Sequence, residues 1–226
     1  MDLFNIPKLI EQGVYDVMMW ILFFPLTMFR MIASPRQTLR YVRLQADNEK
    51  LDTAFSDAMR PALFLFVSIL VGSVIAPDTA DEIKVMSESR FGSVIFGSWA
   101  SNMAFSMIIY CIVPLIGALF LALSRGEKVT RDSLHVPFDQ QCYIGGPSTL
   151  AFTSAVALNP YVGSGTTGLI LFCAAVWLIV VEYIYFRDNS PIGPLAALGL
   201  VIATLMTSII IVALILIFAF SAPQVG

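Results

Sequence analysis

The sequence has few charges and few of the residues that most enzyme centres need. Only 13% of its 226 residues are charged, and it has one histidine, His135, and three cysteines. A single histidine excludes a multi-histidine metal site, and Cys111, Cys142 and Cys173 show no C-x-x-C spacing. No P-loop glycine run is present either. We therefore expect no enzyme activity, no cofactor, no metal and no nucleic-acid partner.

Apolar residues take the place of the missing charges. They make up 58% of the chain, against about 45–50% in a soluble domain, and the mean hydropathy is +0.81. A helix needs about 20 apolar residues to cross a hydrocarbon core of about 30 Å. The sequence predicts an all-α polytopic membrane protein, with an N-terminal region (1–57) and a transmembrane domain (58–222). Five transmembrane helices are expected, near 60–77, 93–123, 139–159, 167–186 and 194–220.

The basic residues are distributed unevenly along this pattern. If the N-terminus is cytoplasmic, the inside segments hold most of them: Lys8, Arg30, Arg36, Arg40, Arg43, Lys50, Arg60, Arg125, Lys128, Arg131 and Arg187. The outside segments then hold only Lys84 and Arg90, among several acidic residues. Basic residues are enriched in the cytoplasmic loops of membrane proteins. We therefore expect a cytoplasmic N-terminus, in a bacterial inner membrane.

An apolar stretch at 14–33 precedes these spans. Its uninterrupted part, 17–29, gives about 20 Å of helix, which is short for a full crossing. It has no polar face, whereas a helix that lies on a membrane surface has a charged side. We expect a shallow re-entrant or interfacial segment that packs on protein and bends at Pro25. A sixth span is the alternative.

A basic cytoplasmic helix is expected next in the chain. Ser34 can cap the free N–H groups at a helix start, and Pro35 suits the first helical position. Arg36, Arg40 and Arg43 then recur on one side of the helix, where they can bind anionic phospholipid headgroups. Alternatively, the helix is solvated and its arginines only fix the orientation of the chain.

The third predicted span is unusually polar and carries a helix-breaking sequence. Four polar residues of the third and fourth spans lie at a similar depth: Asp139, Gln140, Gln141 and Glu182. One interpretation places them in the headgroup zone, paired with arginines at the helix ends. In the other, Gly145, Gly146 and Pro147 break the helix, and the polar residues form a vestibule open to the cytoplasm.

Two sets of small residues recur four residues apart. One set lies in the first span and the other in the last: Ser68, Gly72 and Ala76, and Gly199, Ala203 and Thr207. Small residues at this spacing let helices approach closely in a bilayer. We expect both sets to pack inside the bundle, and the alternative is that one of them contacts a partner chain.

Three segments resemble the Yip1-like membrane-protein superfamily, particularly its bacterial, permease-like members. They are ASPRQTLRYV (33–42), AFSDAMRPALFLFVSILVG (54–72) and YIGGPSTLAFTSAVALNPYVG (143–163). They correspond to a Ser-Pro-led cytoplasmic helix, the first span, and a proline-containing helix that leads to an Asn-Pro and glycine turn. The resemblance extends over residues 33–220. It implies a five-helix fold with a cytoplasmic N-terminus, and it transfers no catalytic residues.

Together these features favour a non-catalytic accessory or scaffold subunit of a larger membrane complex. Its expected partners are the lipid bilayer, anionic phospholipids, and other membrane subunits or copies of itself. The alternative is a permease-like conduit for a small solute or ion, centred on Asp139, Glu182 and the run 145–147. The small number of spans and the lack of an internal repeat weigh against transport.

Overall fold

The computed structural model describes residues 6–47, 58–76 and 90–221, and these residues form helices without any strand. The helices are α1 (Ile6–Ala33), α2 (Pro35–Asp47), α3 (Pro61–Ile75), α5 (Arg90–Ile95), α6 (Trp99–Ser124), α7 (Arg131–Asn189) and α8 (Pro194–Ser221). Three of them, α6, α7 and α8, are long and apolar enough to cross a membrane. The all-α class predicted from the sequence is therefore confirmed for the described residues, and the three long apolar helices support a membrane protein. The predicted count of five spans is not confirmed.

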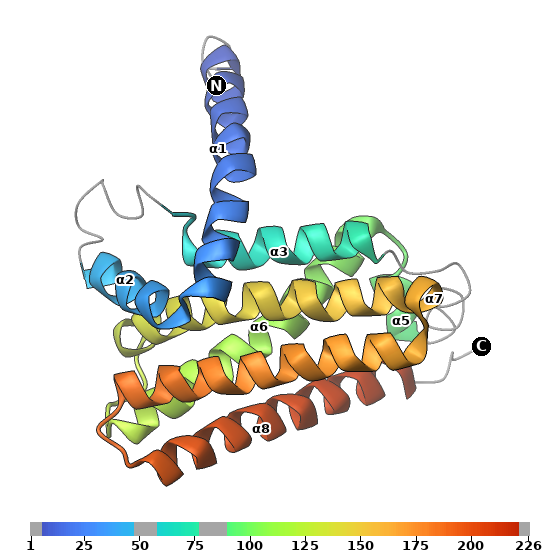
Figure 1. Cartoon of the computed structure of the whole chain (residues 1–226). Helices are drawn as coiled ribbons and strands as arrows, with labels where there is room; N and C mark the ends of the chain where they lie inside the picture. The colour runs from blue at the N-terminus through green and yellow to red at the C-terminus, as the bar shows by residue number, and fades with distance from the viewer. Residues whose placement is uncertain (1–5, 48–57, 77–89, 222–226) are drawn as a thin grey trace.

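Helix α7 folds back on itself at Gly163. This residue has φ 78° and ψ 161°, a backbone conformation that glycine adopts without the steric cost of a side chain. Two hydrogen bonds connect the first limb (131–162) to the second (164–189): Gln141 Nε2 donates to Glu182 Oε2 at 2.9 Å, and the Tyr185 hydroxyl donates to the Pro137 carbonyl at 3.4 Å. The two limbs are therefore antiparallel neighbours, as Figure 1 shows.

A bundle of helices forms the body of the molecule. Helix α3, both limbs of α7, α6 and α8 run side by side, with α7 in contact with α3, α6 and α8 (Figure 1). The largest buried cluster lies where α1, α2 and α3 meet α7, and it includes Phe64, Tyr143, Tyr185 and Phe186. Backbone contacts fix the same region, since Met59 N–H donates to Thr27 Oγ1 at 3.2 Å and the Tyr143 hydroxyl donates to the Met59 carbonyl.

The expected helix break at Gly145, Gly146 and Pro147 is absent. The first limb of α7 continues through all three residues, and the only non-helical backbone within α7 is at Gly163. The glycines instead allow close packing, because a Cβ atom at Gly146 would lie 2.3 Å from Phe64 Cε1. A Cβ at Gly145 would lie 3.1 Å from Leu65 Cδ1. The glycine pair therefore serves the contact with α3, and the prediction of a broken helix was wrong.

The N-terminal helices only partly match the expectations. Helix α1 runs through Pro25 as one helix of 28 residues, and in Figure 1 it projects away from the bundle, with only its C-terminal part against α2 and α3. A re-entrant path is therefore not confirmed. Helix α2 begins at Pro35, where the sequence predicted a helix start. The predicted span at 93–123 is interrupted, because α5 ends at Ile95 and α6 begins at Trp99. Ser98 caps α6, since its Oγ accepts a hydrogen bond from Ser101 N–H at 3.1 Å.

Candidate functional site

A partly open cavity of about 270 Å³ lies among the helices of the bundle, and we name it the inner cavity. Its walls come from α6, both limbs of α7 and α8, and most of them are apolar. The polar lining residues are Tyr110, Gln141, Ser148, Thr149 and Glu182. Ligand sites in proteins commonly combine an apolar wall with a few polar groups that fix orientation. The inner cavity has this composition.

Gln141 and Glu182 form a buried polar pair in the wall of the inner cavity. Both residues are at most 1% exposed, and Gln141 Nε2 donates to Glu182 Oε2 at 2.9 Å. The amide oxygen of Gln141, Oε1, and the second carboxylate oxygen of Glu182, Oε1, are buried and have no partner in the described part of the chain. A buried acceptor without a hydrogen bond is costly. A water or solute that donates hydrogen bonds here would remove that cost.

Gly117 of α6 makes room for the Gln141 side chain. A Cβ atom at this glycine would lie 2.5 Å from Gln141 Nε2 and 2.6 Å from its Cδ. The side chain of Gln141 therefore lies directly against the α6 backbone, which holds its amide next to Glu182. Sequence reasoning did not identify Gly117, because the close approach of two helices cannot be read from either helix alone.

The predicted vestibule residues divide into two groups. Gln141, Gly145 and Glu182 line the inner cavity. Asp139, Gln140, Gly146 and Pro147 are buried outside its lining. Consecutive helical residues point in directions about 100° apart, so Gln140 and Gln141 face different neighbours.

The members outside the cavity have contacts of their own. Gln140 Nε2 donates to the Leu39 carbonyl at 2.7 Å and so joins α7 to α2. Asp139 Oδ2 lies 3.7 Å from His135 Nε2, one helical turn away.

Glu182 binds Gln141 rather than an arginine, while Arg125 Nε donates to the Asn189 carbonyl at 2.7 Å. For Glu182, the predicted pairing with arginines at the helix ends was therefore wrong.

A second hollow of about 410 Å³ lies between α3, α6 and the first limb of α7, and we name it the outer groove. Hydrogen-bonding side chains line it, and none of its lining residues is an acid or a basic residue. Four of the lining residues lie at successive intervals of four along the chain: Ser98, Asn102, Ser106 and Tyr110. Residues spaced by four lie on one face of a helix. These four residues therefore form a row of polar side chains that starts at the N-cap of α6 and runs along one face of the helix.

Tyr110 lines both the outer groove and the inner cavity. It is half-buried at the middle of α6 and stands at the boundary between the two spaces. Thr153 of the first α7 limb lines the outer groove, while Thr149, one turn away, lines the inner cavity. The sequence analysis did not identify this row of residues, although its spacing of four residues is visible in the sequence.

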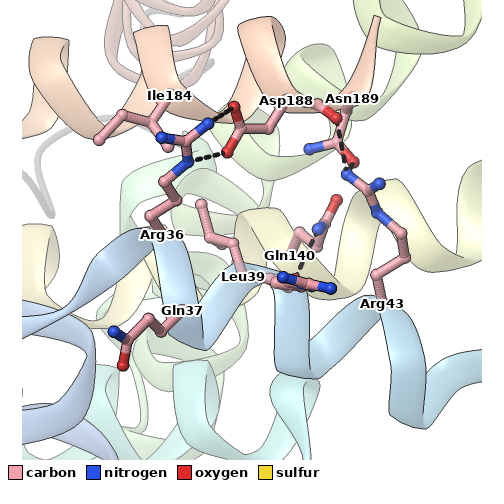
Figure 2. A pocket seen from close by; sticks show the side chains of 9 residues that line it. Arg36, Gln37, Leu39, Arg43, Gln140, Ile184, Asp188 and Asn189 are labelled. Carbon is pink, nitrogen blue, oxygen red and sulfur yellow. Dashed lines mark hydrogen bonds and ion pairs between the residues drawn. The ribbon is translucent and has the colours of Figure 1, made fainter.

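A third hollow, the basic pocket, lies between α2 and the end of α7 and has a volume of about 530 Å³ (Figure 2). Arg36 binds both carboxylate oxygens of Asp188, with Nε to Oδ2 at 2.6 Å and Nη2 to Oδ1 at 2.8 Å. The hydrogen bond and the charge of Asp188 raise the pKa of Arg36. Arg43 Nη2 donates to the Asp188 carbonyl at 3.0 Å and also to Asn189 Oδ1. Two of the three predicted lipid-binding arginines thus hold α2 against α7.

The two sets of small residues have different environments. Ser68 and Gly72 are buried, and a Cβ at Gly72 would lie 3.0 Å from Thr153 Oγ1, so this face packs on α7. Ala76, which follows α3, is half-buried. In α8, Gly199 is exposed, and a Cβ there would have no neighbour within 4 Å. Ala203 and Thr207 are half-buried, and the buried face of α8 carries Ala197, Val201, Thr204 and Ser208 instead.

No three histidine, cysteine, aspartate or glutamate side chains in the described residues form a group that could hold a metal ion. Comparisons with protein-family models, with curated proteins and with solved structures each found no match to this chain.

Proposed function

We propose that this integral membrane protein is a permease-like conduit for a small uncharged solute. The observation that supports it is the pair of hollows in one bundle, the outer groove and the inner cavity, which share Tyr110 in their linings. Both have hydrogen-bonding side chains, and Glu182 is the only acidic or basic residue among the lining residues of the two. A strongly charged solute would find no opposite charge in the outer groove, which favours an uncharged one.

The topology that fits this function has five crossings. They are α3, α6, the two limbs of α7, and α8, with the N-terminus in the cytoplasm of a bacterium. The basic residues Arg125, Arg131 and Arg187 lie at the bundle end that also carries α2, as the positive-inside rule requires. Helix α3 has 15 residues and is about 22 Å long, so its crossing needs a locally thin bilayer. In this orientation the inner cavity lies on the cytoplasmic side of Tyr110.

The Gln141–Glu182 pair is the proposed solute-binding element. It has two buried acceptor oxygens without a partner in the described residues, and a solute hydroxyl or amide could donate to them. Most of the remaining walls are apolar and include Ile144, Phe152 and Leu171. A solute with a few hydrogen-bond donors and a small carbon skeleton matches this environment.

Solute flux into proteoliposomes tests the proposed function. Purified protein is reconstituted, and the shrinkage and recovery of vesicles are followed by light scattering after mixing with glycerol, urea or another small polyol or amide. At least one solute should enter faster than in protein-free vesicles. Gln141→Leu should slow that entry about tenfold, because it removes a hydrogen bond worth about 1–1.5 kcal/mol and the polar partner of Glu182.

Gln37→Leu is the matched control for this substitution. It makes the same chemical change at an exposed position in α2, away from the inner cavity, and should leave the flux at the wild-type rate. If no solute enters faster than in protein-free vesicles, the conduit is wrong. Equal losses of flux in the two variants would mean that Gln141 does not act through the inner cavity.

An accessory or scaffold subunit is the second candidate function. The observation that favours it is the exposed Gly199 face of α8, where a partner helix could approach closely. Purification in a mild detergent, followed by mass spectrometry of the intact assembly, separates the two candidates. A scaffold should retain other membrane proteins in fixed stoichiometry and should lose them in Gly199→Leu. A conduit should purify alone or as copies of itself.

A further inference from the structure

The basic pocket has a charge that its internal contacts do not neutralise. Three arginines of α2 line it, and Asp188 is the only acidic residue among its lining residues. Arg36 binds the Asp188 carboxylate, and Arg43 donates to the neighbouring carbonyl and amide oxygens (Figure 2). One carboxylate therefore faces three guanidinium groups, and the pocket keeps an excess of positive charge.

Arg40 is the arginine that the internal contacts leave available. It is exposed, lies one helical turn after Arg36, and forms no hydrogen bond or ion pair with any residue that the structure describes. Its guanidinium offers five N–H donors in a planar arrangement that suits phosphate oxygens. Gln37 and Gln140 line the same pocket.

The contacts of Arg36 and Arg43 also fix the shape of the pocket. Both side chains extend from α2 to the last turn of α7, and Figure 2 shows them at the two ends of the Asp188–Asn189 segment. Gln140 of the first α7 limb also holds α2 in place, because its Nε2 donates to the Leu39 carbonyl oxygen at 2.7 Å. A ligand would therefore meet a preformed basic wall, which lowers the entropy cost of binding.

Apolar side chains of α1 place the basic pocket near a lipid surface. Met18, Ile21, Leu22 and Phe29 are each more than 60% exposed, on a helix that leads directly into α2. In Figure 1, the C-terminal part of α1 meets the bundle near the end where α2 lies, and the rest of α1 projects away from it. Such a change from exposed apolar to basic surface is typical of the boundary between acyl chains and headgroups.

We propose that the basic pocket binds the phosphate group of an anionic phospholipid, with Arg40 as its principal contact. Arg36 and Arg43 contribute charge and hold α2 in position, and the acyl chains lie along α1. This site is separate from the inner cavity, so the inference does not depend on the conduit. It differs from a general attraction of basic residues to the membrane because one headgroup occupies one defined pocket.

Native mass spectrometry in a neutral detergent tests the site. The full-length protein is stripped of lipid and titrated with phosphatidylglycerol, with phosphatidylcholine as the zwitterionic reference and inorganic phosphate as a separate ligand. The wild type should retain a first phosphatidylglycerol molecule more tightly than phosphatidylcholine. Arg40→Gln should weaken this first binding about fivefold, the factor expected for one cation near a membrane surface.

Arg60→Gln is the matched control, because it removes the same charge at an exposed position before α3 that does not line the pocket. It should bind the first phosphatidylglycerol as the wild type does. Equal weakening in the two variants would overturn the site in favour of general charge attraction. Tight binding of inorganic phosphate with no preference for phosphatidylglycerol would overturn the lipid as the ligand. No preference of the wild type for phosphatidylglycerol over phosphatidylcholine would overturn the inference as a whole.

Discussion

Gly146→Ala is expected to lower the free energy of unfolding by about 1–3 kcal/mol, the usual cost of overpacking a dense core. The new methyl group would lie 2.3 Å from Phe64 Cε1 and 2.9 Å from its Cδ1. Phe64 is fully buried and packs against Phe24 and Tyr143, with ring centroids 5.5 and 5.2 Å away. Its ring therefore cannot move aside without disturbing its neighbours. Unfolding in detergent, followed by circular dichroism or tryptophan fluorescence, measures the loss.

Gly168→Ala provides the control for this prediction. It lies in the second limb of α7, and a Cβ atom there would have no neighbour within 4 Å. This variant should be as stable as the wild type or up to about 1 kcal/mol more stable, because alanine has the higher helix propensity. The double variant Phe64→Leu with Gly146→Ala should lose less than the two single losses combined. Additive losses would contradict the proposed Phe64–Gly146 contact.

Tyr110→Ala is expected to raise the flux of a transported solute about tenfold. Tyr110 lines both the outer groove and the inner cavity, and its ring is the side chain that the two hollows share. Removing the ring would join them, and a barrier lowered by about 1.4 kcal/mol corresponds to a tenfold higher rate. The light-scattering assay on proteoliposomes measures the change.

Two tyrosine variants make this result specific. Tyr110→Phe keeps the ring and should keep the flux close to that of the wild type, because the steric barrier is unchanged. Tyr161→Ala removes a ring that is 85% exposed and lines neither hollow, so it should have no effect. A Tyr110→Ala variant that folds normally but conducts at the wild-type rate would mean that the outer groove and the inner cavity are not parts of one path.

The sequence predicted how far along the bundle a residue lies better than it predicted which neighbouring helix the side chain of that residue faces. The position of Gln141 and Glu182 at one level follows from counting residues along two antiparallel segments, and the structure joins them by a hydrogen bond. Gln140 has the same depth but faces α2, where its amide binds the Leu39 carbonyl. Only the neighbouring helices decide which way each side chain points, and they lie far away in the sequence.

Glycine and proline were the least predictable residues for the same reason. The Gly145–Gly146–Pro147 run has the composition of a helix break, yet the helix continues because the glycines accept Phe64 and Leu65 of α3. Gly163, in contrast, has a positive φ and forms the turn between the limbs of α7. A residue with low helix propensity inside an apolar segment indicates either a turn or a close contact between two helices, and tertiary contacts determine which of the two forms.

Cysteine accessibility from the two sides of the membrane tests the conduit most directly. In a variant without Cys111, Cys142 and Cys173, single cysteines replace Asn102 in the outer groove or Ser148 in the inner cavity. A membrane-impermeant thiol reagent is applied to right-side-out and to inverted vesicles. The conduit predicts that Asn102→Cys reacts only from the outside and Ser148→Cys only from the cytoplasmic side. If neither cysteine reacts faster than one at Leu169, which is 62% exposed and lines neither hollow, water does not reach the two hollows and the conduit is contradicted.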